Sequence, residues 1–121
     1  MRFIGFLIVA MLLLACQTGA DVDGKEREIR ATIESGLSRG ATVEEVQAFL
    51  LAHADVVDDH PARDEWSTFL RSQGVPPDAL VLGARWDVAG GGLIESSVIV
   101  YFRFEQGRYT EYYVQQIHTG P

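Results

Sequence analysis

Histidines and a nearby run of acidic residues are the side chains in this sequence best suited to metal chemistry. His53, Asp58 and His60 lie close together in the sequence, and Asp55 and Asp59 add two carboxylates to the same stretch. Imidazole and carboxylate groups are suitable ligands for zinc and similar ions. The spacing matches no strong metal-binding motif, so we expect a solvated acidic loop with surface histidines, and no metal or other cofactor.

The residues that could supply a catalytic nucleophile are few. Cys16 is the only cysteine, and no serine lies in the Gly-x-Ser-x-Gly motif that exposes a hydrolase nucleophile on a sharp turn. The glycine run at residues 90–92 lacks the Lys and the Ser or Thr of a phosphate-binding loop, and a turn is expected there. Ser96 and Ser97 fall within a predicted strand, as small residues of its pleat. We therefore expect no catalytic residues and no enzyme activity.

Arginine and aromatic side chains gather on one face of the strands predicted in the C-terminal part of the chain. That face carries Arg85, Ile99, Tyr101, Arg103 and Tyr113, or Tyr112 in the other register. Tyr and Arg are enriched where proteins bind proteins, because they offer a large contact area with polar tips. The alternative is a solvated sheet face on which arginine stems lie over tyrosines. We keep both interpretations at this point.

The first 15 residues have the organisation of a secretory signal peptide. Met1 and Arg2 form a basic start, residues 3–14 are apolar, and Ala15 is a small residue before the cleavage point. As a helix, the apolar run would reach only about 18 Å, whereas a membrane crossing needs roughly 30 Å. We therefore expect an exported chain that is cleaved between Ala15 and Cys16, rather than a transmembrane anchor.

The sequence Leu13-Leu14-Ala15-Cys16 resembles the lipobox of bacterial lipoproteins, in which a diacylglyceryl group is attached to the cysteine thiol. This resemblance implies acyl chains such as palmitate on Cys16, and two or more chains make a firm membrane anchor. Because Gln17 rather than Asp follows the cysteine, it also implies an outer-membrane location facing the periplasm in a Gram-negative cell. The alternative is a secreted protein in which Cys16 is incidental.

Charge and cysteine content limit the classes of partner. Ten Lys and Arg against 17 Asp and Glu give a formal net charge of −7, and removal of Arg2 with the leader makes it more negative still. This balance argues against nucleic acid and against attraction to anionic lipid head groups. With Cys16 modified, no thiol is left for a disulfide, so packing must stabilise the fold.

The N-terminal half is predicted to be helical after a short linker. Residues 16–24 contain the lipidated cysteine and a tether of small, polar and acidic residues, which would reach roughly 26 Å if extended. Residues 25–39 place Ile29, Ile33 and Leu37 on one stripe of a helix, and Gly40 is expected to end it.

A second helix is predicted immediately afterwards. Thr42 and Glu45 have the spacing of a capping box. The next apolar positions, with His53 included, are expected on one face: Val46, Phe49, Leu50 and His53.

Residues 54–78 are the least regular stretch. Trp66, Phe69 and Leu70 favour one or two helical turns that end by Gly74. The alternative is an irregular connection with Trp66 and Phe69 in the core.

Beyond residue 78 the apolar pattern alternates, which indicates strands. Three strands are predicted, at residues 80–88, 93–104 and 109–118, and short turns between them favour an antiparallel meander. Helices followed by strands indicate a single α+β domain over residues 25–121, with the helical pair on one face of a three-stranded sheet.

The order of these features, with Gly40-Ala41-Thr42-x-x-x-Val46-x-x-x-Leu50 at its centre, resembles small envelope lipoproteins of the BamE/SmpA type. That group resembles β-lactamase inhibitor protein in its module of two helices and three strands. The resemblance implies a non-enzymatic protein that binds another envelope protein or a cell-wall component, as an outer-membrane assembly or structural accessory.

A second class of function fits the acidic charge of the chain. An inhibitor or immunity-type protein would bind a secreted enzyme, and a basic target would associate quickly with an acidic domain.

Overall fold

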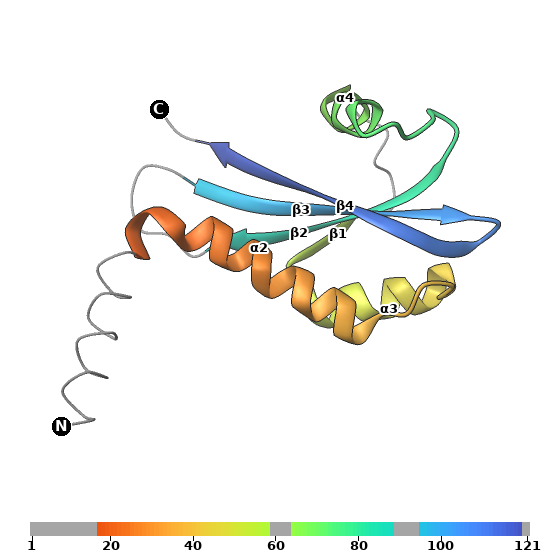
Figure 1. Ribbon diagram of the computed structural model, residues 1–121, viewed down its shortest axis with the longest axis horizontal. Coiled ribbons are helices and arrows are strands. Elements are labelled where there is room, and N and C mark those ends of the chain that lie inside the picture. The colour runs from red at the N-terminus through yellow and green to blue at the C-terminus, as the bar shows by residue number, and fades with distance from the viewer. Residues whose placement is uncertain (1–16, 59–63, 89–94, 120–121) are drawn as a thin grey trace.

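The computed structural model describes residues 17–58, 64–88 and 95–119, which form helices packed on a four-stranded antiparallel sheet. The helices are α2 (Gln17–Gly36), α3 (Val43–His53) and α4 (Asp64–Ser72). The strands are β1 (Val56–Asp58), β2 (Leu80–Val88), β3 (Glu95–Glu105) and β4 (Arg108–Thr119), and they follow chain order across the sheet (Figure 1). The α+β class is confirmed, whereas the prediction of three strands is wrong by one strand.

Helix α2 is longer than predicted at its N-terminal end. Residues 17–24, expected to form an extended tether, are helical, and the helix ends at Gly36 instead of residue 39. Ile29 and Ile33 are 3% and 1% exposed and form the buried stripe that their spacing predicts. Val22 packs against the same core, so apolar contacts already begin within the segment that was expected to be a tether.

A tight turn connects α2 to α3 and joins both helices to β4. Gly40 has φ +94°, a conformation that glycine adopts without the steric cost of a side chain. Its N–H donates to the carbonyl of Tyr109, and the N–H of Tyr109 donates to the carbonyl of Ala41, both at 2.8 Å. Gly40 therefore shapes this turn and does not end α2 as predicted.

The predicted capping box at the start of α3 is confirmed. The Thr42 hydroxyl accepts the backbone N–H of Glu45 at 3.2 Å, and the Glu45 carboxylate accepts the N–H of Thr42 at 3.3 Å. Val46 and Leu50 are fully buried, as their positions predict. His53 is exposed and lies beside the ring of Phe49, so it does not belong to the buried face.

Strand β1 is the element that the sequence did not predict. Its three residues pair antiparallel with residues 83–85 of β2. Val56 and Val57 stand between acidic residues, and three residues are too few to show the alternation that reveals a strand. The acidic stretch is therefore not wholly a loop, because its first part forms one edge of the sheet.

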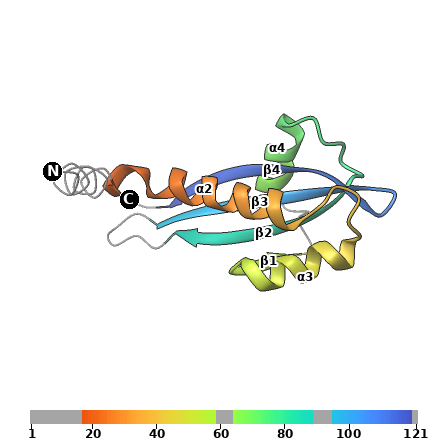
Figure 2. The same ribbon diagram turned by 60° about the horizontal axis from the view of Figure 1, so that its bottom comes forward.

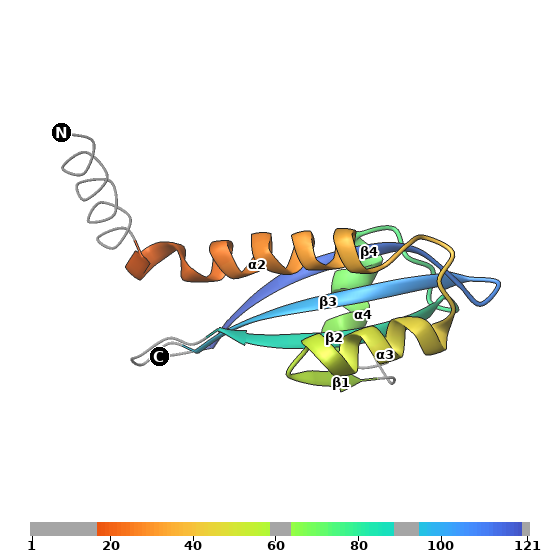
Figure 3. The same cartoon turned by 90° about the horizontal axis from the view of Figure 1, so that it is seen from below.

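Helix α4 confirms the helical turns that were predicted for Trp66, Phe69 and Leu70. It lies on the opposite face of the sheet from α2 and α3. Figures 2 and 3 show this arrangement, with α2 and α3 in front of the sheet and α4 behind it when seen from below. Phe69 and Leu70 pack against the sheet, and α4 runs into a turn at Gly74. The side chain of Trp66 lies outside the described residues.

The sheet thus separates two apolar cores. The strands β2, β3 and β4 form the predicted meander, with a register shift between Arg103 and Phe104. On the side of α2 and α3, Val98, Val100 and Phe102 are fully buried. On the side of α4, Ile99 and Tyr101 are buried in a smaller cluster. Both faces of β3 are therefore covered, whereas antiparallel sheets commonly have one solvated face.

Candidate functional site

The predicted protein-binding face is largely covered by the chain itself. Ile99 is 5% exposed and Tyr101 is 0% exposed. The ring of Phe69 in α4 lies 5.3 Å from that of Tyr101, and Leu70, Val75 and Val81 are buried in the same cluster. The prediction that Ile99 and Tyr101 lie on an open face is therefore wrong, because α4 packs on this side of the sheet, where no helix was expected.

Arg103 and Tyr113, two further residues of that face, make contacts within the chain. Arg103 forms ion pairs with Glu105 at 3.3 Å and Glu111 at 3.5 Å. The Tyr113 hydroxyl donates to Glu111 at 2.6 Å. Burial and then this hydrogen bond raise the pKa of Tyr113, so the phenol stays protonated as a donor. Both side chains are half-buried, and Glu111 accepts contacts from both of them, while Arg103 Nε is buried without a hydrogen-bond partner among the described residues.

Arg85 is the exposed member of the predicted set. Its Nε lies 2.9 Å from Asp87 Oδ1, and the Ser97 hydroxyl donates to the same oxygen at 3.2 Å. Arg85 lies directly opposite Ile99 in the β2–β3 register, at the border of the apolar cluster, but its own side chain stays exposed. The five predicted residues therefore do not form one exposed surface, because Ile99 and Tyr101 are buried.

Ser96 and His118 form a serine–histidine pair that the sequence analysis did not single out. Their side chains lie 3.0 Å apart, between Ser96 Oγ and His118 Nδ1. The two residues are directly opposite each other in β3 and β4, so the correct register would have revealed the contact. A nucleophilic serine needs a base that a third group orients. Within the described part of the chain, no such third group is hydrogen-bonded to this histidine.

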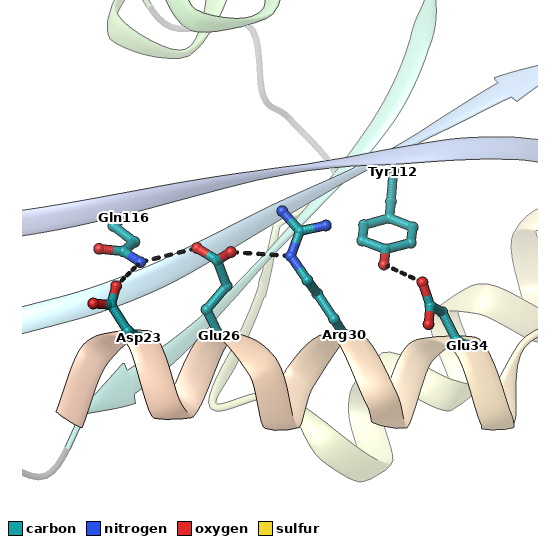
Figure 4. Close-up of polar contacts among 6 residues, drawn as sticks. All are labelled: Asp23, Glu26, Arg30, Glu34, Tyr112 and Gln116. Atoms are coloured by element: carbon teal, nitrogen blue, oxygen red, sulfur yellow. Dashed lines mark hydrogen bonds and ion pairs between the residues drawn. The ribbon is translucent and has the colours of Figure 1, made fainter. Parts of the chain in front are cut away.

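A continuous set of polar contacts runs between α2 and β4, and Figure 4 shows it in close-up. The Gln116 amide donates to Asp23 at 2.8 Å and to Glu26 at 2.9 Å. Glu26 in turn pairs with Arg30 at 3.0 Å. We call this set the α2–β4 strip, and its members are Asp23, Glu26, Arg30, Glu34, Tyr112 and Gln116.

The strip ends at Tyr112, which contacts both a cation and an anion. The Arg30 guanidinium lies 5.6 Å from the centre of the Tyr112 ring, and the Tyr112 hydroxyl donates to Glu34 at 3.1 Å. Burial is the largest cause that raises the pKa of Tyr112, so its hydroxyl remains a donor at neutral pH. Three carboxylates then face one guanidinium, which leaves the strip with two net negative charges.

The two edges of the sheet differ in length and in protection. Strand β1 has three residues, and the Asp55 carboxylate accepts the N–H of Asp87 at 2.7 Å, beyond the end of the β1–β2 pairing. Strand β4 has 12 residues and is the last strand of the sheet. Short strands and charged side chains are the usual means of blocking an edge. The β1 edge has both, whereas the β4 edge is long.

The registers show which peptide groups of β4 point away from the sheet. In antiparallel strands, directly opposite residues both point their N–H and C=O groups either toward or away from each other. The Asp87 N–H points to the β1 side, away from β3, so the peptide groups of its partner Ser97 point toward β4. The peptide groups of Ile117, which lies opposite Ser97, therefore point back toward β3. Within residues 112–117, alternation along β4 then directs three peptide groups outward, those of Tyr112, Val114 and Gln116. Among the described segments, none pairs with these groups.

A groove lies at the turn between α2 and α3, on a different part of the surface. Its volume is about 560 Å³, and its lining residues include Leu37, Arg39, Glu45 and Phe49. A methyl group on Gly36 would lie 2.6 Å from the Phe49 ring, so the two helices approach closely here. Its lining combines small and apolar residues with one cation, Arg39, and one anion, Glu45.

The residues weighed for metal binding are not assembled by the described structure. His53 ends α3 and Asp58 ends β1, while His60 and Asp59 lie outside the described residues. Within residues 17–58, 64–88 and 95–119, no group of three or more His, Cys, Asp or Glu is placed to hold a metal ion.

The residues of the predicted lipid anchor, Ala15 and Cys16, also lie outside the described residues, as does the glycine run 90–92. In the part of the chain that the structure covers, no helix has the length and apolar character of a membrane span.

Comparison with known proteins gives no relative. No protein-family model, no curated protein and no solved structure matches this chain.

Proposed function

We propose that this chain is a lipid-anchored protein of the bacterial cell envelope that acts, without catalysis, by binding another envelope protein or a cell-wall component. The observation that carries the proposal is Leu13-Leu14-Ala15-Cys16 after a short apolar leader. Lipid on Cys16 would hold the domain at a membrane, in a Gram-negative cell the outer membrane facing the periplasm. The resemblance to BamE/SmpA-type lipoproteins supports a role as an assembly or structural accessory.

The surface of the described domain is consistent with a binding role. The α2–β4 strip and the β4 edge lie next to each other, and together they offer carboxylates, a tyrosine and peptide groups with which no described segment pairs. Such groups bind other proteins through hydrogen bonds and charge complementarity.

Lipid attachment is tested by expressing the full chain in a Gram-negative host with an alkyne analogue of palmitate. We expect labelled protein in the membrane fraction and a mature chain that begins at Cys16. The Cys16→Ser variant should lose the label and leave that fraction, whereas His53→Ala, at an exposed position, should retain both. An unlabelled wild-type chain that keeps residues 1–15 would contradict the anchor.

Partner binding is tested by crosslinking in the same cells, followed by mass spectrometry of the linked peptides. We expect one envelope partner linked reproducibly to residues near α2 and β4. A chain that is lipidated but yields only monomer after crosslinking would contradict a binding role while leaving the anchor intact.

The acidic charge favours a second candidate, an inhibitor or immunity-type protein. A net charge of −7 would attract a basic secreted enzyme. Inhibition of a basic secreted hydrolase that weakens steeply with salt would support this candidate over an assembly role.

A further inference from the structure

The exposed edge of β4 combines three properties that suit the addition of another strand. It is 12 residues long, its outward peptide groups at Tyr112, Val114 and Gln116 have no partner among the described segments, and residues 112–117 carry no charge, proline or glycine. Natural sheets usually protect an edge with charges, prolines or bulges. The register shift in β4 lies near its start, before residue 112.

We propose that β4 binds an extended segment of a partner protein, which adds to the sheet as a fifth strand and in which basic residues alternate with apolar ones. This inference rests on the proposed function, since it names the surface through which the domain binds a protein. The added backbone would pair with the outward N–H and C=O groups, and its side chains would alternate between the two faces of the sheet.

The basic residues of the partner follow from the face that α2 covers. Tyr112, Val114 and Gln116 direct their side chains to this face, where Tyr112 and Gln116 reach the carboxylates of the α2–β4 strip. Cross-strand neighbours lie about 5 Å apart, so alternate residues of an added strand come close to these carboxylates. Lys or Arg at those positions matches the two net negative charges of the strip.

The apolar residues of the partner follow from the opposite face. Tyr113 and Ile117 are partly buried at the border of the cluster that contains Tyr101 and Ile99. Apolar side chains beside them would extend that cluster and remove more of its surface from water. Alternate positions of the partner are therefore apolar, as in an ordinary half-buried strand.

Charge also decides between a partner protein and a second copy of this chain. Each copy carries a net charge of −7, and pairing of two β4 strands would bring two acidic strips toward each other. A basic segment experiences attraction at the same place. Self-pairing through β4 is therefore an outcome that would contradict the proposal.

The test uses the full chain in nonionic detergent and a capped peptide, Lys-Val-Lys-Ile-Lys-Val, as the probe. Backbone amide exchange is followed by NMR with and without the peptide. We expect slower exchange at Tyr112, Val114 and Gln116, since hydrogen bonding protects amides. A peptide with Glu in place of Lys, and one in which the same residues do not alternate, should protect these amides at least about tenfold less.

Two variants at position 114 isolate the contribution of the β4 backbone N–H to peptide binding. Val114→Pro removes an outward N–H that β3 does not use, and proline is tolerated on sheet edges. Val114→Ala shortens the side chain but keeps the N–H. We expect peptide affinity to fall about tenfold or more in Val114→Pro relative to Val114→Ala, with both chains folded by circular dichroism.

The outcomes separate clearly. Protection confined to the three outward amides and lost with the acidic peptide supports the proposal, even if Val114→Pro fails to fold. Equal protection by the acidic peptide, protection at amides that are not on the outer edge of β4, or β4 amides already protected in a dimer would overturn it. Those results leave lipidation of Cys16 and crosslinking to a partner untouched, so they contradict the strand-addition proposal alone.

Discussion

At the scale of single residues, polar side chains accept hydrogen bonds from backbone N–H groups near the ends of the helices and strands. Thr42 and Glu45 satisfy each other's backbone N–H groups at the start of α3. The Asp55 carboxylate likewise accepts the backbone N–H of Asp87, near the end of β2. In each case an oxygen accepts a hydrogen bond from a backbone donor that the regular structure leaves unpaired.

Removal of the Thr42 hydroxyl should weaken the start of α3. We expect Thr42→Ala to lower the free energy of unfolding by about 1 kcal/mol, because the N–H of Glu45 loses its acceptor. Urea denaturation followed by circular dichroism measures the change. Thr42→Ser keeps the hydroxyl and should stay close to wild type; equal losses in both variants would show that the methyl group matters instead.

Tyr101 is a core residue, and its replacement tests the two interpretations of its face. We expect Tyr101→Ala to lower the free energy of unfolding by roughly 3–5 kcal/mol, because a fully buried ring is removed. Tyr101→Phe removes only the hydroxyl that donates to Gln115 at 2.7 Å and should cost roughly 1 kcal/mol.

Arg85→Ala, at an exposed position of the same face, serves as the control and should change stability by less than about 0.5 kcal/mol. A mild effect of Tyr101→Ala, similar to that of the control, would restore the open-face interpretation.

The raised pKa of Tyr109 predicts that the folded domain loses stability at alkaline pH. Burial is the largest cause that raises its pKa from 10.0 to about 12, followed by the nearby Tyr112. Between these pH values the unfolded chain loses the phenolic proton while the folded chain keeps it, so stability falls as pH rises. The loss attributable to Tyr109 should approach roughly 2 kcal/mol.

Denaturant midpoints measured across this pH range test the effect. Tyr109→Phe has no proton to lose, so its stability should fall less steeply than that of the wild type. Parallel pH profiles for the two proteins would show that other groups account for the alkaline loss.

At the scale of elements, the sequence predicted the helices and strands whose apolar residues show at least one full helical or strand repeat. It missed the segments that are too short to show one. The stripe of Ile29 and Ile33, the capping box and the meander all follow from local spacing. Strand β1 has three residues and depends on pairing with β2, a contact that local spacing does not encode. The start of α2 was missed for a related reason, since Val22 is the one residue among the described side chains of 22–24 that packs against the core, too few to show a helical repeat.

The candidate site was harder to predict than the fold. The sequence grouped Arg85 with Tyr101 by alternation alone, but the position of α4 decides which of them is exposed. The α2–β4 strip joins residues about 90 positions apart, such as Asp23 and Gln116, and only the packing of α2 along β4 brings them together.

The short edge strand gives a prediction at the same scale. We expect Asp55→Ala to lower the free energy of unfolding by about 1 kcal/mol, because the N–H of Asp87 loses its acceptor. Asp55→Asn retains an acceptor oxygen and should lose less. Thermal unfolding of both variants provides the comparison, and identical midpoints to wild type in both would show that water replaces the carboxylate without cost.

At the scale of the whole molecule, the two cores should differ in how readily they open. The central strand β3 has fully buried residues on both faces, whereas among the described side chains of α4, those of residues 68–72, Leu70 alone is buried in the smaller cluster. Local opening requires less free energy where fewer apolar contacts are lost.

Native-state hydrogen exchange should therefore show the slowest amides at Val98, Val100 and Phe102, and the fastest helical exchange in α4. Leu70→Ala should accelerate exchange in α4 while β3 changes little. Uniform exchange across both faces, or equal acceleration in β3, would indicate one cooperative unit instead.

The continuity of α2 has a mechanical consequence. Residues 17–24 advance about 1.5 Å each as a helix, so they span roughly 12 Å, less than half of their extended length. The same helix packs against the core through Ile29 and Ile33, so a rigid helical segment, with no flexible linker, connects Gln17 to the sheet. A pull or a twist applied at Gln17 is therefore transmitted directly to β3 and β4, and any support at that end also sets the direction in which the β4 edge faces.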